Sequence, residues 1–136
     1  MADKNFTLEI VTPRKMVFRG EAGSFSAPGV MGAFQVLVDH APMLAEIGIG
    51  EVNVRERDGK NTNYATSGGV VEVKKNHVIL LAESAERADE IDRQRAGAAR
   101  DRAKKRLEEK PAGIDVERAR IALLRAINRL KVSTRG

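Results

Sequence analysis

Hydrophobic and polar residues alternate in short runs along most of the first 86 residues. Residues 6–11, Phe-Thr-Leu-Glu-Ile-Val, place apolar side chains at nearly every second position before Thr12-Pro13 interrupts the run. This pattern is typical of a β-strand that buries one face. We therefore predict that the chain opens with a strand.

Further runs of the same kind follow, separated by glycine, proline and asparagine. They lie around Phe18 and at residues 23–27, 33–38, 51–55, 63–66, 70–73 and 77–83. Asp58-Gly59 is a hairpin signal between two of them, and Lys75-Asn76 marks another turn. Many short strands joined by tight turns indicate a sandwich or a flattened barrel.

From about residue 87 the hydrophobic period changes to between three and four. Alanines recur among long charged side chains without a proline until Pro111, which predicts a helix. The expected apolar face of this helix consists of Ile91, Ala99, Ala103 and Leu107. The break at 111–113 is followed by a second expected apolar face, made of Val116, Ala119, Leu123, Ala126, Ile127 and Leu130. We predict two antiparallel helices joined by a short turn.

The predicted fold class is α+β, with a β-sandwich at residues 1–86 and a helical hairpin at residues 87–136. Because the first helix offers mostly alanine, it buries little apolar area at about 25 cal/mol per Å². We expect only a few kcal/mol to separate the folded hairpin from separated helices. A ligand or partner can shift an equilibrium of that size.

The two parts differ in charge. Residues 1–86 carry nine basic and eleven acidic side chains, a net charge of −2, whereas residues 87–136 carry fifteen and eight, a net charge of +7. With one tyrosine and no tryptophan, the chain offers few surfaces on which nucleic-acid bases stack. Carboxylates interspersed along the basic helices would also repel a phosphate backbone. A protein partner with acidic loops fits better than nucleic acid.

The absence of cysteine excludes disulfides and thiolate metal sites, and it favours a reducing compartment such as the cytoplasm. The longest apolar stretch, residues 78–82, is far shorter than the roughly 20 residues of a membrane helix. The only histidines are His40, which precedes a proline turn, and His77. They suggest neither a metal cluster nor a nucleophile with its base. We expect no catalytic residue and no metal.

The helices also carry candidate residues for an anion site. Arg125 and Arg129 stand four residues apart, where like charges destabilise a helix and a bound anion relieves them. Asp92 and Arg95 lie three apart on the first helix, and Glu86 lies near its start. A folded hairpin would gather these groups around a polyphosphate or a nucleotide. The alternative is a solvated charged face with local ion pairs.

Residues 32–42, Gly-Ala-Phe-Gln-Val-Leu-Val-Asp-His-Ala-Pro, residues 67–73, Ser-Gly-Gly-Val-Val-Glu-Val, and the helix pair resemble the epsilon subunit of bacterial F-type ATP synthase. The resemblance covers essentially the whole chain. It implies a non-catalytic rotor subunit of the central stalk, with a sandwich of about ten strands that binds gamma and the membrane c-ring. It also implies a peripheral location at the cytoplasmic face of the bacterial cell membrane, reached only through the complex.

The resemblance further implies a regulatory role for the helices. In this family they either fold against the sandwich or extend along gamma into the catalytic head of alpha and beta subunits, and the extended form blocks ATP hydrolysis. Acidic loops of the beta subunits then meet the basic helices. The remaining alternative is a free-standing nucleotide or phosphate sensor, which would never join the complex.

Some family members bind ATP as a regulatory ligand in the folded hairpin, and this chain resembles them. Residues 91–96 match their Ile-Asp-x-x-Arg-Ala motif. The implied ATP-binding residues are Glu86, Ile91, Asp92, Arg95, Ala96, Arg125 and Arg129. A second copy of the motif, at residues 114–119, reduces the specificity of the first.

The chain departs from the family near the expected c-ring contact. Val38-Asp39 replaces a common Pro-Gly, Gln35 replaces a glycine, and Ala33 replaces an acidic residue. We therefore expect this loop to adopt a conformation other than the one that glycine permits. The c-ring contact would then depend on His40 and the neighbouring backbone.

Overall fold

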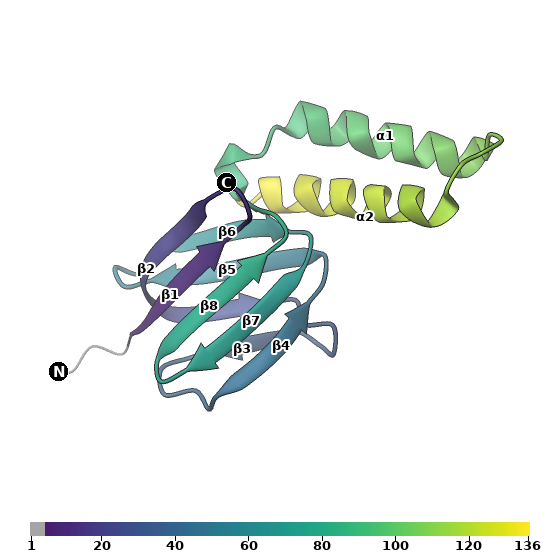
Figure 1. The fold of residues 1–136 in the computed structure, drawn as a ribbon. Helices are drawn as coiled ribbons and strands as arrows, with labels where there is room; N and C mark the ends of the chain where they lie inside the picture. The colour runs from purple at the N-terminus through teal and green to yellow at the C-terminus, as the bar shows by residue number, and fades with distance from the viewer. Residues whose placement is uncertain (1–4) are drawn as a thin grey trace.

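A computed structural model describes residues 5–136. Nine strands form one continuous sheet that folds over into two layers, and two helices follow (Figure 1). The strands are β1 (Phe6–Val11), β2 (Met16–Ala27), β3 (Phe34–Val36), β4 (Met43–Ile47), β5 (Gly50–Glu56), β6 (Asn61–Thr66), β7 (Gly69–Lys74), β8 (His77–Ala82) and β9 (Ala85–Arg87). A 3₁₀ turn, η1 (Ala88–Glu90), leads into α1 (Arg93–Glu109) and α2 (Val116–Ser133). The predicted α+β class and helical hairpin are confirmed, with nine strands among residues 5–136 in place of about ten.

The strand order is β4-β7-β8-β1-β2-β5-β6-β9, with β3 paired to β2. Neighbouring strands are antiparallel except for β1 and β8, which run parallel. Figure 1 shows β4, β7, β8 and β1 in the near layer and β5, β6 and β3 in the far one. The twelve-residue β2 joins the two layers, because it pairs with β1 on one side and with β5 on the other.

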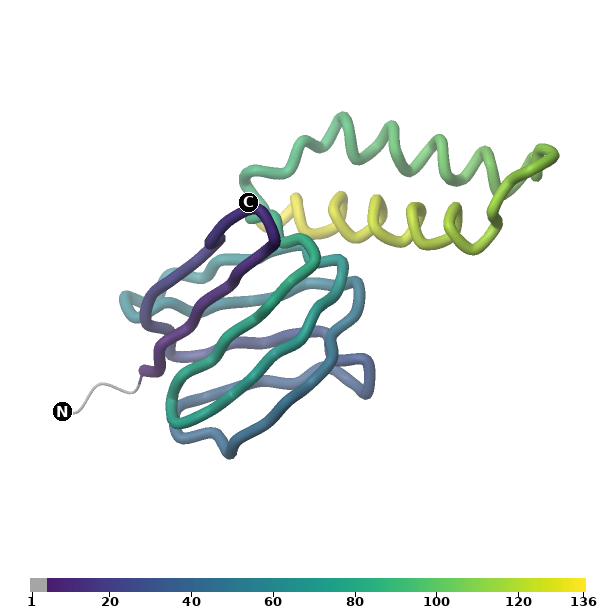
Figure 2. The backbone as a smooth tube through the Cα atoms, viewed as in Figure 1, coloured from purple at the N-terminus to yellow at the C-terminus, as the bar shows by residue number. Residues whose placement is uncertain are grey.

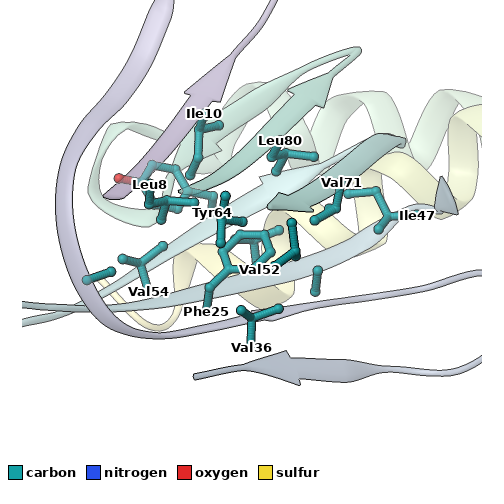
Figure 3. Packing of buried hydrophobic residues seen from close by; sticks show 14 of the residues in the cluster. Leu8, Ile10, Phe25, Val36, Ile47, Val52, Val54, Tyr64, Val71 and Leu80 are labelled. Atoms are coloured by element: carbon teal, nitrogen blue, oxygen red, sulfur yellow. The ribbon is translucent and has the colours of Figure 1, made fainter. Parts of the chain in front are cut away.

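The core fills the space between the layers. Leu8 and Ile10 from β1 point toward Phe25 and Val52 from the other layer (Figure 3). All four side chains are fully buried. Burial of each such side chain stabilises the fold by about 1.5 to 3 kcal/mol. The alternation of apolar and polar residues that predicted β1 therefore also indicates which face of the strand lies in the core.

Several strands differ from the prediction. Phe18 and residues 23–27, expected as separate runs, belong to the single strand β2, which passes a register shift between Ala22 and Ser24. The run expected at residues 33–38 shortens to β3, since a turn follows Val36. Strands β4 and β9 were not predicted, and the domain boundary that we expect between residues 86 and 87 falls inside β9.

One glycine is required by the close approach of two strands. Gly69 begins β7 with a φ of 152°, and a Cβ there would lie 2.2 Å from the Leu81 carbonyl oxygen of β8. No side chain fits at that distance. The Gly68-Gly69 pair therefore marks the start of β7, where the two strands approach closely.

The hairpin stands beside one end of the sandwich, and α2 lies between α1 and the strands (Figures 1 and 2). Figure 2 shows the closed end of the hairpin projecting away from the sandwich, while the C-terminus returns to it. Helix α2 contacts β5, β6 and η1. The hairpin is therefore held to the sandwich through the end of α2.

Candidate functional site

Both helices begin in the same way. The Asp92 carboxylate accepts a hydrogen bond from the Arg95 backbone N–H at 3.0 Å, and Asp115 accepts one from Arg118 at the same distance. Each aspartate is thus an N-cap. The alanines that follow, Ala96 and Ala119, are buried. The repeated Ile-Asp-x-x-Arg-Ala motif therefore has a structural role as a helix start, which explains its second occurrence.

Few side chains of α1 are buried between the two helices. Ala96 and Ala103 are the buried residues of α1, whereas Ala99 and Leu107 are half-buried. Ile91, which we expected on this helical face, precedes α1 and packs in a separate small cluster with Ala65, Ala88 and Val132. The expectation for Ile91 was wrong because α1 begins two residues later.

The C-terminal end of α2 makes the contacts with the sandwich. Val132 is fully buried in the small cluster, and the Asn128 side-chain amide donates to the Gly50 carbonyl oxygen at 2.8 Å. Arg135 pairs with Glu51 at 3.1 Å. Gly136 follows, so close to η1 that a Cβ would lie 2.8 Å from the Asp89 nitrogen.

A pocket of about 330 Å³ lies where α2 meets β6 and β9. Arg129 lines it and forms a bidentate pair with Glu86, with its Nε 2.6 Å from Oε1 and its Nη2 3.0 Å from Oε2. Arg125 also lines it, and its Nη2 lies 3.9 Å from Oε2 of Glu83. An arginine held by a carboxylate in this way can hold a phosphate instead.

The structure brings only some of the predicted site residues together. Glu86, Arg125 and Arg129 share the pocket, whereas Ile91, Asp92, Arg95 and Ala96 do not line it. Ile91 and Ala96 are buried, Asp92 caps α1, and the Arg95 side chain is exposed.

The pocket also contains residues that the sequence reasoning missed, namely Ala65, Thr66, Ser67, Glu83, Ser84 and Asn128. The Ser67 and Ser84 hydroxyl oxygens lie 2.6 Å apart, although the residues are 17 positions apart in sequence. They meet because Thr66 of β6 pairs with Ala85 of β9. No local pattern in the sequence reports that pairing.

The backbone conformation of the loop before His40 differs from the one that we expected. Asp39, at the position where relatives carry glycine, has a φ of 62°, which lies in the left-handed region that glycine favours. Its backbone N–H donates to Asn76 Oδ1 at 2.6 Å, and Asn76 Nδ2 donates back to Asp39 Oδ1 at 2.8 Å. Aspartate tolerates this conformation because its short side chain makes local hydrogen bonds. His40 is half-buried, with Nδ1 2.7 Å from the Ala41 carbonyl oxygen.

Two features are absent from the described part of the chain. Within residues 5–136 no helix is both long and apolar enough to cross a membrane. In the same described part of the chain, no three His, Cys, Asp or Glu side chains are grouped so that they could hold a metal ion.

Known proteins resemble this chain in sequence over nearly its full length. The ATP synthase epsilon chain of Moorella thermoacetica is 45% identical over 129 residues, which cover 95% of this chain and 96% of that protein. The epsilon chain of Desulforamulus reducens is 46% identical over 130 residues, which cover 96% and 98%. In structure, a chain of the Euglena gracilis mitochondrial ATP synthase superimposes with a TM-score of 0.82 at 18% identity, covering 98% of this chain and 83% of that one.

Two family models divide the chain between them. The model "ATP synthase, Delta/Epsilon chain, beta-sandwich domain" matches residues 5–88, and the model "ATP synthase, Delta/Epsilon chain, long alpha-helix domain" matches residues 89–134. The sequence order, the sandwich and the hairpin all agree with these matches. The chain belongs to the ATP synthase epsilon-chain family, whose members are non-catalytic subunits of that enzyme.

Proposed function

We propose that this chain is a central-stalk rotor subunit, which couples rotation of the c-ring to gamma through its sandwich and inhibits ATP hydrolysis through its helices. The inhibitory role is supported by the way the hairpin contacts the sandwich, which is mainly through the end of α2. The Glu86–Arg129 pair, Asn128 and buried Val132 are its main contacts. Docking through the end of α2, with few contacts elsewhere, supports a hairpin that can leave the sandwich.

The extended hairpin would meet the acidic loops of the beta subunits in the catalytic head of alpha and beta subunits. The net charge of +7 on residues 87–136 supports such a contact. We further propose a peripheral position on the cytoplasmic face of the bacterial membrane, with the c-ring contact formed by His40 and its loop. The Asp39–Asn76 hydrogen bonds hold that loop in place.

The outer face of the near layer offers a surface for gamma. Leu44, Val70 and Leu81 are exposed there, with 73%, 39% and 57% of their surfaces accessible. Val70 of β7 pairs directly with Leu81 of β8, whereas Leu44 of β4 pairs with Glu72, two residues further along β7 on the same face. The adjacent pair of Val70 and Leu81, with Leu44 on the same face, supports a protein contact.

Replacing Leu81 with glutamate is expected to weaken association with gamma without unfolding the sandwich, because the side chain points away from the core. Co-purification of gamma with the tagged subunit would measure the effect. The matched control is Val116→Glu, since Val116 is also exposed, at 47%, but lies on α2. Equal recovery of gamma with both variants would contradict this surface, and a wild-type chain that never associates would favour the free-standing sensor.

We also propose that the folded hairpin binds ATP as a regulatory ligand near Glu86, Arg125 and Arg129. Phosphate oxygens would replace the Glu86 carboxylate on Arg129, and Arg125 would hold a further phosphate. Asp92, Arg95, Ile91 and Ala96 would contribute only after a shift of the start of α1, since they lie outside the pocket. The bidentate carboxylate pair on Arg129 supports this role.

Binding of ATP is expected to stabilise the chain by about 2.7 kcal/mol at a concentration one hundred times its dissociation constant. Thermal unfolding of the full chain with increasing ATP would measure this, and Arg129→Ala should remove the effect. The control is Arg93→Ala, which also removes an exposed arginine of the hairpin but none that lines the pocket. An unfolding temperature that does not change with ATP would contradict the site.

A further inference from the structure

Strand β4 lies at one end of the sheet and lacks a neighbouring strand on most of the side away from β7 (Figure 1). It pairs with β7 from Met43 to Ile47. On the other side only its end is covered, where the Val30 N–H donates to the Glu46 carbonyl oxygen at 3.0 Å. In the part of the chain that the structure describes, no strand pairs with this side of residues 43–45. We call this open segment the β4 edge.

The open hydrogen-bonding groups of the β4 edge belong to Leu44. In a strand the N–H and C=O groups of one residue point to the same side, and successive residues alternate. Because the Glu46 carbonyl points away from β7, the N–H and C=O groups of Leu44, two residues earlier, point away from β7 as well. Within β4 there is no lysine, proline or bulge, the features that commonly prevent another strand from pairing with an edge. The β4 edge can therefore accept an added strand.

The side chains of β4 are less buried where its edge is open. Ile47, at the covered end, is only 2% exposed and belongs to the main core. Met43 and Ala45 point to the same inner face but are only half-buried, although Met43 packs against that core. A strand beside the β4 edge would cover these two side chains, as residues 28–30 lie beside Ile47. Removal of their apolar area from water would stabilise the complex.

The outer face of the β4 edge carries an apolar residue next to two carboxylates. Leu44 is 73% exposed and pairs with Glu72 of β7, and Glu46 lies two residues further along β4. Both glutamates are exposed, and within residues 5–136 neither has an ion-pair partner. A strand that fits this edge therefore has an apolar side chain next to Leu44 and a basic one next to Glu46.

We propose that an extended segment of gamma pairs with the β4 edge as an additional strand. Its backbone exchanges hydrogen bonds with Leu44, and its side chains supply the apolar and basic residues that fit the outer face. The inference rests on the proposed role of this chain as a partner of gamma. The β4 edge is continuous with the surface proposed for gamma, since Leu44 belongs to both. Strand addition adds a backbone contact that side-chain packing on that surface does not require.

Two variants of Leu44 separate the backbone contact from the side-chain contact. Leu44→Ala and Leu44→Pro both remove the leucine side chain, but only proline also removes the backbone N–H. Proline is tolerated in edge strands where the N–H faces solvent, so both full-length variants should fold, which circular dichroism would check. Titration of each variant with purified gamma is expected to show at least about fivefold weaker binding for Leu44→Pro than for Leu44→Ala, because a carbonyl group of gamma loses its donor.

Hydrogen exchange at the Leu44 amide provides a second measurement, which needs no substitution. In the unaltered chain this exchange should be fast without gamma and should slow when gamma binds. Equal affinities of the two folded variants for gamma, or unchanged exchange at Leu44 in the complex, would overturn strand addition alone. Failure of the unaltered chain to bind gamma would contradict the proposed function as well. Slow exchange at Leu44 that depends on the concentration of this chain, without gamma, would instead assign the β4 edge to a second copy of the chain.

Discussion

Replacing Val132 with aspartate is expected to release the end of α2 from the sandwich. Val132 is fully buried against Ala65, Ala88 and Ile91, and this cluster contains no cation. Burial of an unpaired carboxylate costs several kcal/mol, which exceeds the few kcal/mol that we expect to hold the hairpin in place. Amide hydrogen exchange would then become fast throughout residues 93–133 and remain slow in β1 and β8.

The matched control for this change is Leu124→Asp. It introduces the same charge on the same helix at a residue that is 42% exposed, so no burial cost arises. Its amide exchange should resemble that of the unaltered chain. If both variants leave α2 equally protected, the end of α2 is not what holds the hairpin to the sandwich.

The sequence predicted best those strands whose side chains alternate between core and solvent. In β1 the alternation coincides with the burial of Phe6, Leu8 and Ile10. In β2 the glycine at 20 suggested a break, yet the strand continues because Gly20 pairs with Leu8 of β1 and the next part of β2 pairs with β5. Pairing with strands that are distant in sequence decides whether β2 continues. The residues of β2 alone do not show that pairing.

Strand β9, which borders the candidate site, also could not be predicted from the sequence. Residues 85–87 have no alternating pattern, and they form a strand because β6 offers them a free edge. This pairing places Glu86 opposite α2, where Arg129 reaches it from 43 residues further along the chain. The sequence could identify the two residues as candidates, but it could not show that they bind one another.

The Ile-Asp-x-x-Arg-Ala motif had two possible meanings in the sequence, and the structure separates them. Its aspartate and alanine start a helix in both copies, which accounts for Asp92 and Asp115 without any ligand. The arginines Arg95 and Arg118 have no such local role, since only their backbone N–H groups take part in capping. Their side chains are therefore the informative part of the motif for function.

The Asp39 loop shows that a missing glycine does not always change a backbone conformation. We expected another conformation from the replacement of glycine, whereas Asp39 adopts the left-handed one. Two hydrogen bonds with Asn76 offset the cost, and these residues are 37 positions apart. The contact between Asp39 and Asn76 could not be predicted from the sequence alone.

Removing residues 88–136 is expected to raise ATP hydrolysis by the assembled complex. The truncation ends after β9, so Arg87 still pairs with Tyr64 and the main core of the sandwich remains intact. If the hairpin inhibits with a coupling free energy of 1 to 3 kcal/mol, its removal should increase the rate about 5- to 150-fold. Steady-state hydrolysis by purified complexes, with the amount of this subunit quantified in each, would measure the increase.

The same complexes provide the control for coupling. Because the proposed surfaces for gamma and the c-ring lie on the sandwich, the truncated subunit should remain bound and proton-driven ATP synthesis should continue. A complex that lost the subunit would instead show reduced coupling of hydrolysis to proton transport. An unchanged hydrolysis rate with the truncated subunit fully present would mean that the helices do not inhibit this enzyme, and the basic charge of the hairpin would then require another partner.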